Sequence, residues 1–127
     1  MKIDLRITVN AGPNTDTQDT AKIVRELEKE LRHVESVLSI DPVYVRNEEA
    51  GQKGVSVDFG ALLVALAEGT GLAAFITVLG QWLGRDRRRS LKLQIGDSSL
   101  ELTGLSSGEQ QELVRWFQTQ TGMRFDA

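Results

Sequence analysis

The chain has 127 residues, of which 40% are apolar and 26% are charged, and its formal net charge is −3. These values are typical of one globular domain and exclude a disordered chain, while so mild a charge leaves any nucleic-acid binding to a local patch. The chain has no cysteine, which excludes disulfides and thiolate chemistry and fits a reducing cytoplasm. Charged residues interrupt the first six positions, so we expect no signal peptide and a cytoplasmic protein.

Residues 2–10 alternate strictly between apolar and polar side chains, which predicts a strand with one face in the core. Gly12, Pro13 and Asn14 break this strand. The opposite face must meet water or another protein, and it makes a candidate interface. Its polar residues are Lys2, Asp4, Arg6 and Thr8.

An amphipathic helix is predicted over roughly 16–33, because apolar residues recur at helical spacing on a charged surface. Thr15 and Gln18 have the spacing of a capping box at its start. Residues 36–46 are rich in β-branched and aromatic residues, which favours a second strand. Pro42 cannot donate a ladder hydrogen bond, so this strand is expected to be bent or at an edge there. Residues 47–54 are expected to form a loop.

The segment 59–84 carries only one charge, Glu68, and many small residues. We predict a long apolar helix, kinked by glycine at residues 69–71, that packs in the core of the domain. Asp58 is expected to cap this helix, and Glu68 to find a polar partner or an opening to water. Because a hydropathy window over 61–79 also nominates a transmembrane span, membrane insertion of residues 59–84 remains the alternative.

The last third of the chain predicts a hairpin and a helix. A turn at Gly96 and Asp97 would pair Leu93 with Leu100 and Leu91 with Leu102. Ser106 to Glu109 forms a second capping box, for a helix over about 107–120. Its inward residues are expected to be Leu113, Trp116 and Phe117.

Together these elements predict a single α+β domain over residues 1–127 with the order β-α-β-α-β-β-α. We expect a four-stranded mixed or antiparallel sheet with helices packed mainly on one face. No internal repeat or second domain is evident in the sequence.

The sequence offers little catalytic chemistry. His33 is the only histidine and lies near the end of the first helix, where an imidazole commonly sits beside free carbonyls. No phosphate loop, nucleophile elbow or zinc spacing occurs, so no catalytic residue, cofactor site or metal site is predicted. An enzyme using Asp58 and Glu68 is a minor alternative.

The sharpest local charge feature is the arginine run, residues 85–89, which contains Arg85, Arg87, Arg88 and Arg89 around Asp86. A solvated helix end explains such a run, since the helix dipole favours cations there. The alternatives are an acidic protein partner, or the phosphate groups of a nucleic acid or lipid. Nucleic-acid binders usually add exposed aromatics or a readable motif, so no nucleic acid is expected.

Several stretches of small and apolar residues resemble the effector-associated constant component family of bacterial conflict systems. The resemblance is strongest over about 53–118. It includes Val57-Asp58-Phe59-Gly60-Ala61-Leu62-Leu63 and the stretches 71–74, 82–83, 85–89, 91–96, 101–104 and 106–111. The resemblance implies a protein encoded beside variable effectors, such as caspase-like or trypsin-like proteases, and it implies no catalytic residues.

We therefore expect a non-catalytic adaptor or regulator that associates with an effector and forms homo-oligomers, with no cofactor. Its expected contact surfaces are the polar face of the first strand and the arginine run. A membrane-anchored component that inserts residues 59–84 is the alternative function. The strand with Pro42, or the edge of the hairpin, could also add a neighbouring strand.

Overall fold

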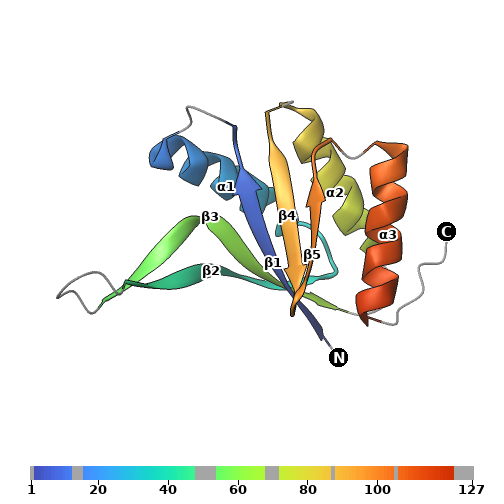
Figure 1. Cartoon of the computed structure of the whole chain (residues 1–127), viewed down its shortest axis with the longest axis horizontal. Helices are drawn as coiled ribbons and strands as arrows, with labels where there is room; N and C mark the ends of the chain where they lie inside the picture. Colours follow the sequence, from blue (N-terminus) through green and yellow to red (C-terminus); the bar gives the residue numbers. More distant parts are fainter. Residues whose placement is uncertain are drawn as a thin grey trace.

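The computed structural model describes residues 2–12, 16–47, 54–67, 72–86, 88–104 and 106–121. The strands are β1 (Lys2–Asn10), β2 (Val37–Asn47), β3 (Gly54–Ala67), β4 (Ser90–Ile95) and β5 (Ser98–Leu102). The helices are α1 (Thr17–Leu31), α2 (Leu72–Gly84) and α3 (Ser107–Thr121). Figure 1 shows the strands side by side with the helices packed against them. The predicted α+β class is confirmed.

The described strands form one sheet in the order β2-β3-β1-β4-β5, and all neighbouring strands are antiparallel. The prediction of four strands was wrong because it assigned residues 59–67 to a helix. These residues belong to β3, which lies between β2 and β1. The observed order is therefore β-α-β-β-α-β-β-α.

Alternation of large and small side chains explains why residues 61–67 form a strand. Leu62, Val64 and Leu66 are buried, and they lie directly across from Ile7, Leu5 and Ile3 of β1. The intervening positions are alanines except for Leu63. A strand with neighbours on both sides reads as a nearly continuous apolar run, which periodicity alone does not separate from a buried helix.

Only the second half of the predicted long helix is helical, as α2. Asp58 lies within β3 opposite Val43, so the prediction that it caps a helix was wrong. Glu68 and the predicted glycine kink at residues 69–71 lie outside the described residues. None of the described helices is both long and apolar enough to cross a membrane.

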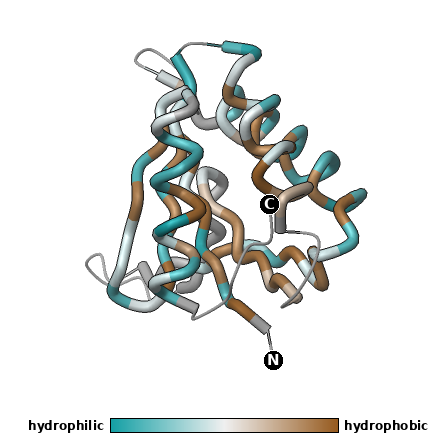
Figure 2. Tube along the Cα trace, turned by 90° about the vertical axis from the view of Figure 1, so that its right-hand side faces the viewer, coloured by the Kyte–Doolittle hydropathy of each residue, from teal (hydrophilic) through white to brown (hydrophobic). Residues whose placement is uncertain are grey.

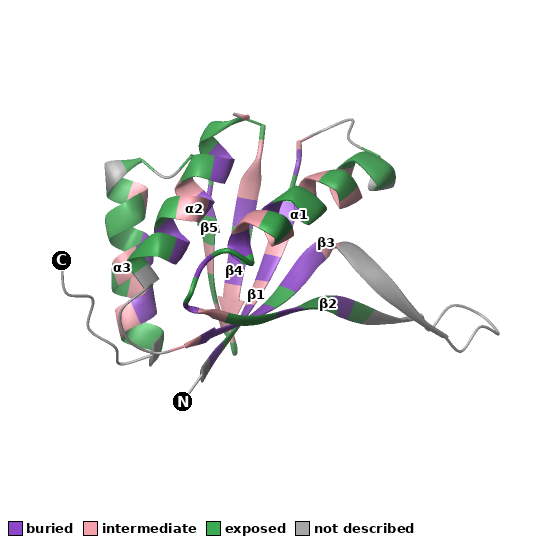
Figure 3. Ribbon diagram, turned by 180° about the vertical axis from the view of Figure 1, so that it is seen from behind, coloured by how far each residue is buried: buried purple, intermediate pink, exposed green. Residues whose placement is uncertain are grey.

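The core lies between the sheet and the helices, which all cover the same sheet face, as predicted. The helices contribute fully buried residues to one apolar cluster with the strands; these are Leu27 and Leu31 of α1, Phe75, Leu79 and Trp82 of α2, and Leu113 and Phe117 of α3. Figure 3 shows buried residues on the sheet and on the helix sides that face it. In Figure 2 hydrophobic and hydrophilic residues alternate along the same elements.

The first helix agrees with its predicted range, but its cap differs. The carboxylate of Asp16 accepts a hydrogen bond from the backbone N–H of Asp19 at 2.7 Å, so Asp16 is the N-cap. The capping box predicted from Thr15 and Gln18 was therefore placed one residue too early. Thr15 itself lies outside the described residues.

The predicted hairpin is confirmed in its register, with Leu93 opposite Leu100 and Leu91 opposite Leu102. At the start of α3 the Glu109 N–H donates to the Ser106 hydroxyl oxygen at 3.3 Å, which is one of the two hydrogen bonds of the predicted capping box. The Glu109 carboxylate also accepts from the hydroxyl of Thr103 at 2.7 Å and from the N–H of Gly104 at 3.0 Å. These bonds join the end of β5 to α3.

Strand β2 lies at the edge of the sheet, and its pairing with β3 shifts between Pro42 and Val43. Both features were expected from Pro42. Beyond the shift, residues 43–47 and 54–58 pair only with each other. They extend from the sheet as a two-stranded ribbon (Figure 1).

Candidate protein-interaction surface

In the part of the chain that the structure describes, the helices lie on one face of the sheet and none lies on the other, which we call the open sheet face (Figures 1 and 3). Side chains directly opposite one another on neighbouring strands point to the same side, so the register defines which residues it contains. They are Ser39 and Asp41 of β2, Ala61, Leu63 and Ala65 of β3, Asp4, Arg6 and Thr8 of β1, Lys92 and Gln94 of β4, and Ser99 and Glu101 of β5.

The residues predicted for the polar face of the first strand lie on this open sheet face. Asp4 is exposed, while Arg6 and Thr8 are partly buried between their strand neighbours. Lys2 belongs to β1, but its side chain is outside the described residues. The position of Asp4 and Arg6 is as expected, and their contact with a partner stays a prediction.

Three large apolar side chains are exposed in the part of the chain that the structure describes, and all three lie on β2 and β3. The exposed fractions are 58% for Leu38, 63% for Tyr44 and 42% for Leu63. Leu38 is at a register shift of the edge strand, and Tyr44 follows the buried Val43 in the ribbon. Leu63 is different because it lies on a central strand, in the open sheet face.

Sequence reasoning missed Leu63 because it placed residue 63 inside a helix. The signal was nevertheless present, since a leucine interrupts an otherwise regular line of alanines at 61, 65 and 67. Across the sheet Leu63 lies between Asp41 on one side and Arg6 on the other. An apolar side chain is thus flanked by an acidic and a basic one.

The arginine run folds back on its own domain. Arg85 forms an ion pair with Glu30 of α1, and Arg89 lies 3.9 Å from the carboxylate of Glu26 on the same helix. Arg89 also donates to the backbone carbonyl of Trp82 at 3.1 Å, and its side chain is only 11% exposed. Arg85 and Arg89 thus tie the segment after α2 to α1, a role that local sequence could not reveal.

Within the arginine run, the Arg88 side chain is more exposed than those of Arg85 and Arg89, and it pairs with Asp86 at 3.1 Å. Hydrogen bonding and the positive charge of Arg88 lower the pKa of Asp86. The reciprocal hydrogen bond with Asp86 raises the pKa of Arg88, and the hydrogen bond with Glu30 raises the pKa of Arg85. Arg87 is outside the described residues, and contact of the arginine run with a partner stays a prediction.

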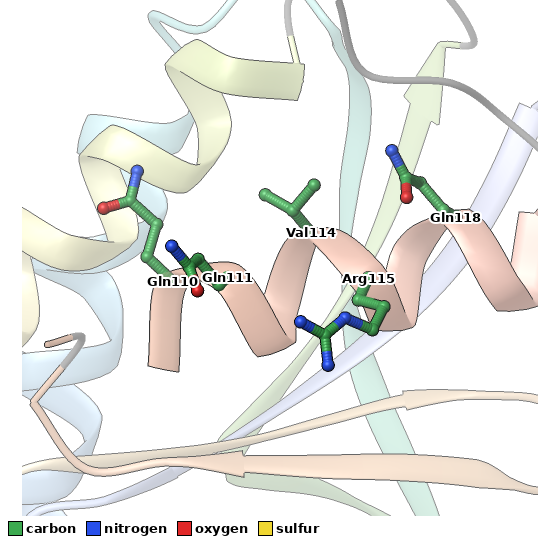
Figure 4. Close-up of a pocket in the computed structure, with 5 residues that line it drawn as sticks. All are labelled: Gln110, Gln111, Val114, Arg115 and Gln118. Carbon is green, nitrogen blue, oxygen red and sulfur yellow. The ribbon is translucent and has the colours of Figure 1, made fainter. Parts of the chain in front are cut away.

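A shallow hollow of about 480 Å³ runs along α3 (Figure 4). Its described lining residues are Gln110, Gln111, Val114, Arg115 and Gln118. Neutral amides and one guanidinium provide hydrogen bonds, but these five residues include no nucleophile or general base with a pKa near neutrality. The hollow therefore offers amide and guanidinium groups for polar contacts.

Other candidates for chemistry are dispersed. His33 is exposed just after α1, and its backbone N–H donates to the Glu30 carbonyl at 3.2 Å. Within the described ranges no group of three or more histidine or acidic residues is placed to hold a metal ion. Of the two residues in the enzyme alternative, Asp58 is in the β2–β3 ribbon and Glu68 is outside the described residues.

In the described ranges these features define a small α+β domain whose helices all lie on one face of the sheet. The chain belongs to the Effector Associated Constant Component 1 family, whose model matches residues 14–123. The family name describes a component that is associated with effectors.

No curated protein matches the chain significantly. Among solved structures, a phage SAM lyase in complex with S-methyl-5′-thioadenosine is 12% identical and has a TM-score of 0.35. That match covers 80% of this chain and 89% of the lyase chain. So low a TM-score does not establish a shared fold.

Proposed function

We propose that the protein is a non-catalytic adaptor of a bacterial conflict or anti-phage defence system, which associates with variable effectors and with itself. Membership of an effector-associated family supports the first association. The observation that carries the proposal is the open sheet face with Leu63, 42% exposed, on a central strand. Along β3 Leu63 continues a line of alanines, and across the strands it is flanked by Asp41 and Arg6, so an apolar centre has a charged rim, as in protein contact sites.

The charged groups support a binding role over a catalytic one. A general acid or base works best with a pKa near the operating pH. Ion pairs instead shift the pKa values of Arg85, Asp86 and Arg88 in the direction that keeps each group charged. Arg85 holds the end of α2 to α1 in this way, and Arg88 stays charged at the surface, where an acidic partner can reach it.

Co-expression with the effector encoded beside it tests the adaptor role. We expect a tagged copy of the chain to retain the effector through size-exclusion chromatography. An Arg88→Glu variant tests whether the arginine run contacts the effector. Arg88 is suitable because it is exposed and because its replacement leaves the ion pairs of Arg85 and Arg89 with α1 intact. Failure of the wild-type chain to retain any neighbouring effector would overturn the adaptor role.

The non-catalytic proposal has its own test, which uses Asp58→Ala and Glu68→Ala together. We expect the double variant to keep the fold, the effector and full protection in a phage challenge. Loss of protection with the fold and effector binding intact would instead support the enzyme alternative.

A further inference from the structure

Asp41, Leu63 and Arg6 form a row across three neighbouring strands of the open sheet face. Leu63 of β3 pairs directly with Asp41 of β2 and with Arg6 of β1. Because neighbouring strands lie roughly 4.8 Å apart, the acidic and basic residues are roughly 10 Å from each other. Across the three strands the row therefore carries a negative charge at Asp41, an apolar side chain at Leu63 and a positive charge at Arg6.

Such a row is complementary to a second copy of itself in one orientation. Consider two open sheet faces stacked about a twofold axis that runs along β3 through Leu63. Each Leu63 then faces the other Leu63, each Asp41 faces the other copy's Arg6, and both ion pairs form at once. A twofold axis perpendicular to the strands would instead stack Asp41 on Asp41 and Arg6 on Arg6, which like-charge repulsion disfavours.

The neighbouring positions fit the same arrangement. Ala61 and Ala65 lie before and after Leu63 on the open sheet face, so no bulky side chain of β3 keeps the two leucines apart. In the next row Ser39 and Asp4 flank Ala65, so the same axis brings each Ser39 hydroxyl to the other copy's Asp4 carboxylate. Stacked sheets cross at about 30°, which displaces side chains one strand from the axis by only roughly 2–3 Å.

We propose that two copies of the chain associate face to face through the open sheet face, about a twofold axis along β3, with Leu63 at the centre and Asp41 paired with Arg6 of the other copy. This rests on the self-association in the proposed function and assigns a surface to it. The contact spans β2, β3 and β1. Lys92 of β4 and Glu101 of β5 lie on the same face but outside the overlap.

Charge reversal gives a test specific to this geometry. Asp41→Arg alone sets arginine against arginine at both symmetric contacts, and Arg6→Glu alone sets acid against acid. We expect each variant to weaken dimerisation at least about tenfold, because one substitution acts at two contacts. Mixed together, the two variants should form a heterodimer, since both contacts are again between opposite charges. Sedimentation velocity across a concentration series measures the monomer–dimer equilibrium of each variant and of their mixture.

Further variants separate this surface from general effects on folding. Leu63→Asp should abolish the dimer, whereas Lys92→Glu on the same face should leave it unchanged, and circular dichroism verifies the fold of each. If Arg6→Glu does not fold, Asp41→Arg and Leu63→Asp still decide the outcome. A dimer that survives both would place self-association elsewhere, and a wild-type monomer at all concentrations would overturn the proposal. Neither result affects the co-purification experiment, which tests effector binding separately.

Discussion

The guanidinium carbon of Arg89 lies 4.6 Å from the centre of the Trp82 ring, while the same guanidinium donates a hydrogen bond to the Trp82 carbonyl. A residue from the charged run after α2 thus covers a fully buried tryptophan of that helix. Since Arg89 also approaches Glu26, it links α1, α2 and the start of β4.

Replacing Arg89 with methionine keeps an apolar stem but removes the cation over the ring and the donor to the carbonyl. We expect the free energy of unfolding to fall by about 1–2 kcal/mol. Urea denaturation measures the change. Arg88→Met is the matched control, because the Arg88 side chain is 70% exposed and its replacement should change the free energy of unfolding much less than that of Arg89. Equal effects of the two substitutions would contradict this role for Arg89.

Gly12 should not tolerate alanine. Its φ is +102°, and a β-carbon there would lie 2.9 Å from the β-carbon of Arg88. Backbone strain and this contact should together destabilise Gly12→Ala by about 1–3 kcal/mol, seen as a lower melting temperature. Gly104→Ala is the control, because an added β-carbon there has no neighbouring atom within 4 Å. An unchanged melting temperature for Gly12→Ala would show that the turn adapts.

The indole N–H of Trp116 donates to the Ser98 hydroxyl oxygen at 2.9 Å and ties α3 to β5. We expect Ser98→Ala and Trp116→Phe each to lower the free energy of unfolding by about 1 kcal/mol or more. In a double-mutant cycle measured by denaturant unfolding, the two effects should not add, with a coupling of about 0.5–1.5 kcal/mol. Additive effects would mean that the hydrogen bond contributes nothing.

Asp86 should make stability sensitive to acid. Its side-chain hydrogen bond with Arg88 lowers its pKa below the ordinary 3.8, so the folded state favours the ionised carboxylate. This contribution is present at neutral pH and disappears as the pH falls through the folded-state pKa. Asp86→Asn should therefore be less stable than the wild type at pH 7, and the difference should shrink in stronger acid. Unfolding curves at pH 7 and in stronger acid measure the difference in stability between the variant and the wild type. A difference that does not depend on pH would contradict the stabilising role of the ionised Asp86.

Much of the fold was predictable because it depends on short-range pattern. Period-two alternation identified β1. The same alternation on both sides of the turn at Gly96 identified the β4–β5 hairpin. Helical spacing identified α1 and α3, and Pro42 marked the irregular edge strand. In each case neighbouring residues carried the information, because side-chain direction repeats every 2 residues in a strand and about every 3.6 in a helix.

The segment around residues 59–67 was not predictable in the same way. An apolar run rich in alanine fits a buried helix as well as a central strand, and β2 and β1 must both be in place before the strand is favoured. The arginine run shows a similar limit. Its sequence indicated a solvated helix end, yet Arg85 pairs with Glu30, a residue 55 positions earlier in the chain.

Local patterns in the sequence were enough to predict an α+β fold with an alternating first strand, and its motifs identified the family. Long-range packing was needed to place β3 between β2 and β1 and to bring Asp41, Leu63 and Arg6 into one row. Those three residues are far apart in the chain, and no local period relates them. Their alignment depends on the register of two strand pairs, which long-range packing of the whole sheet determines.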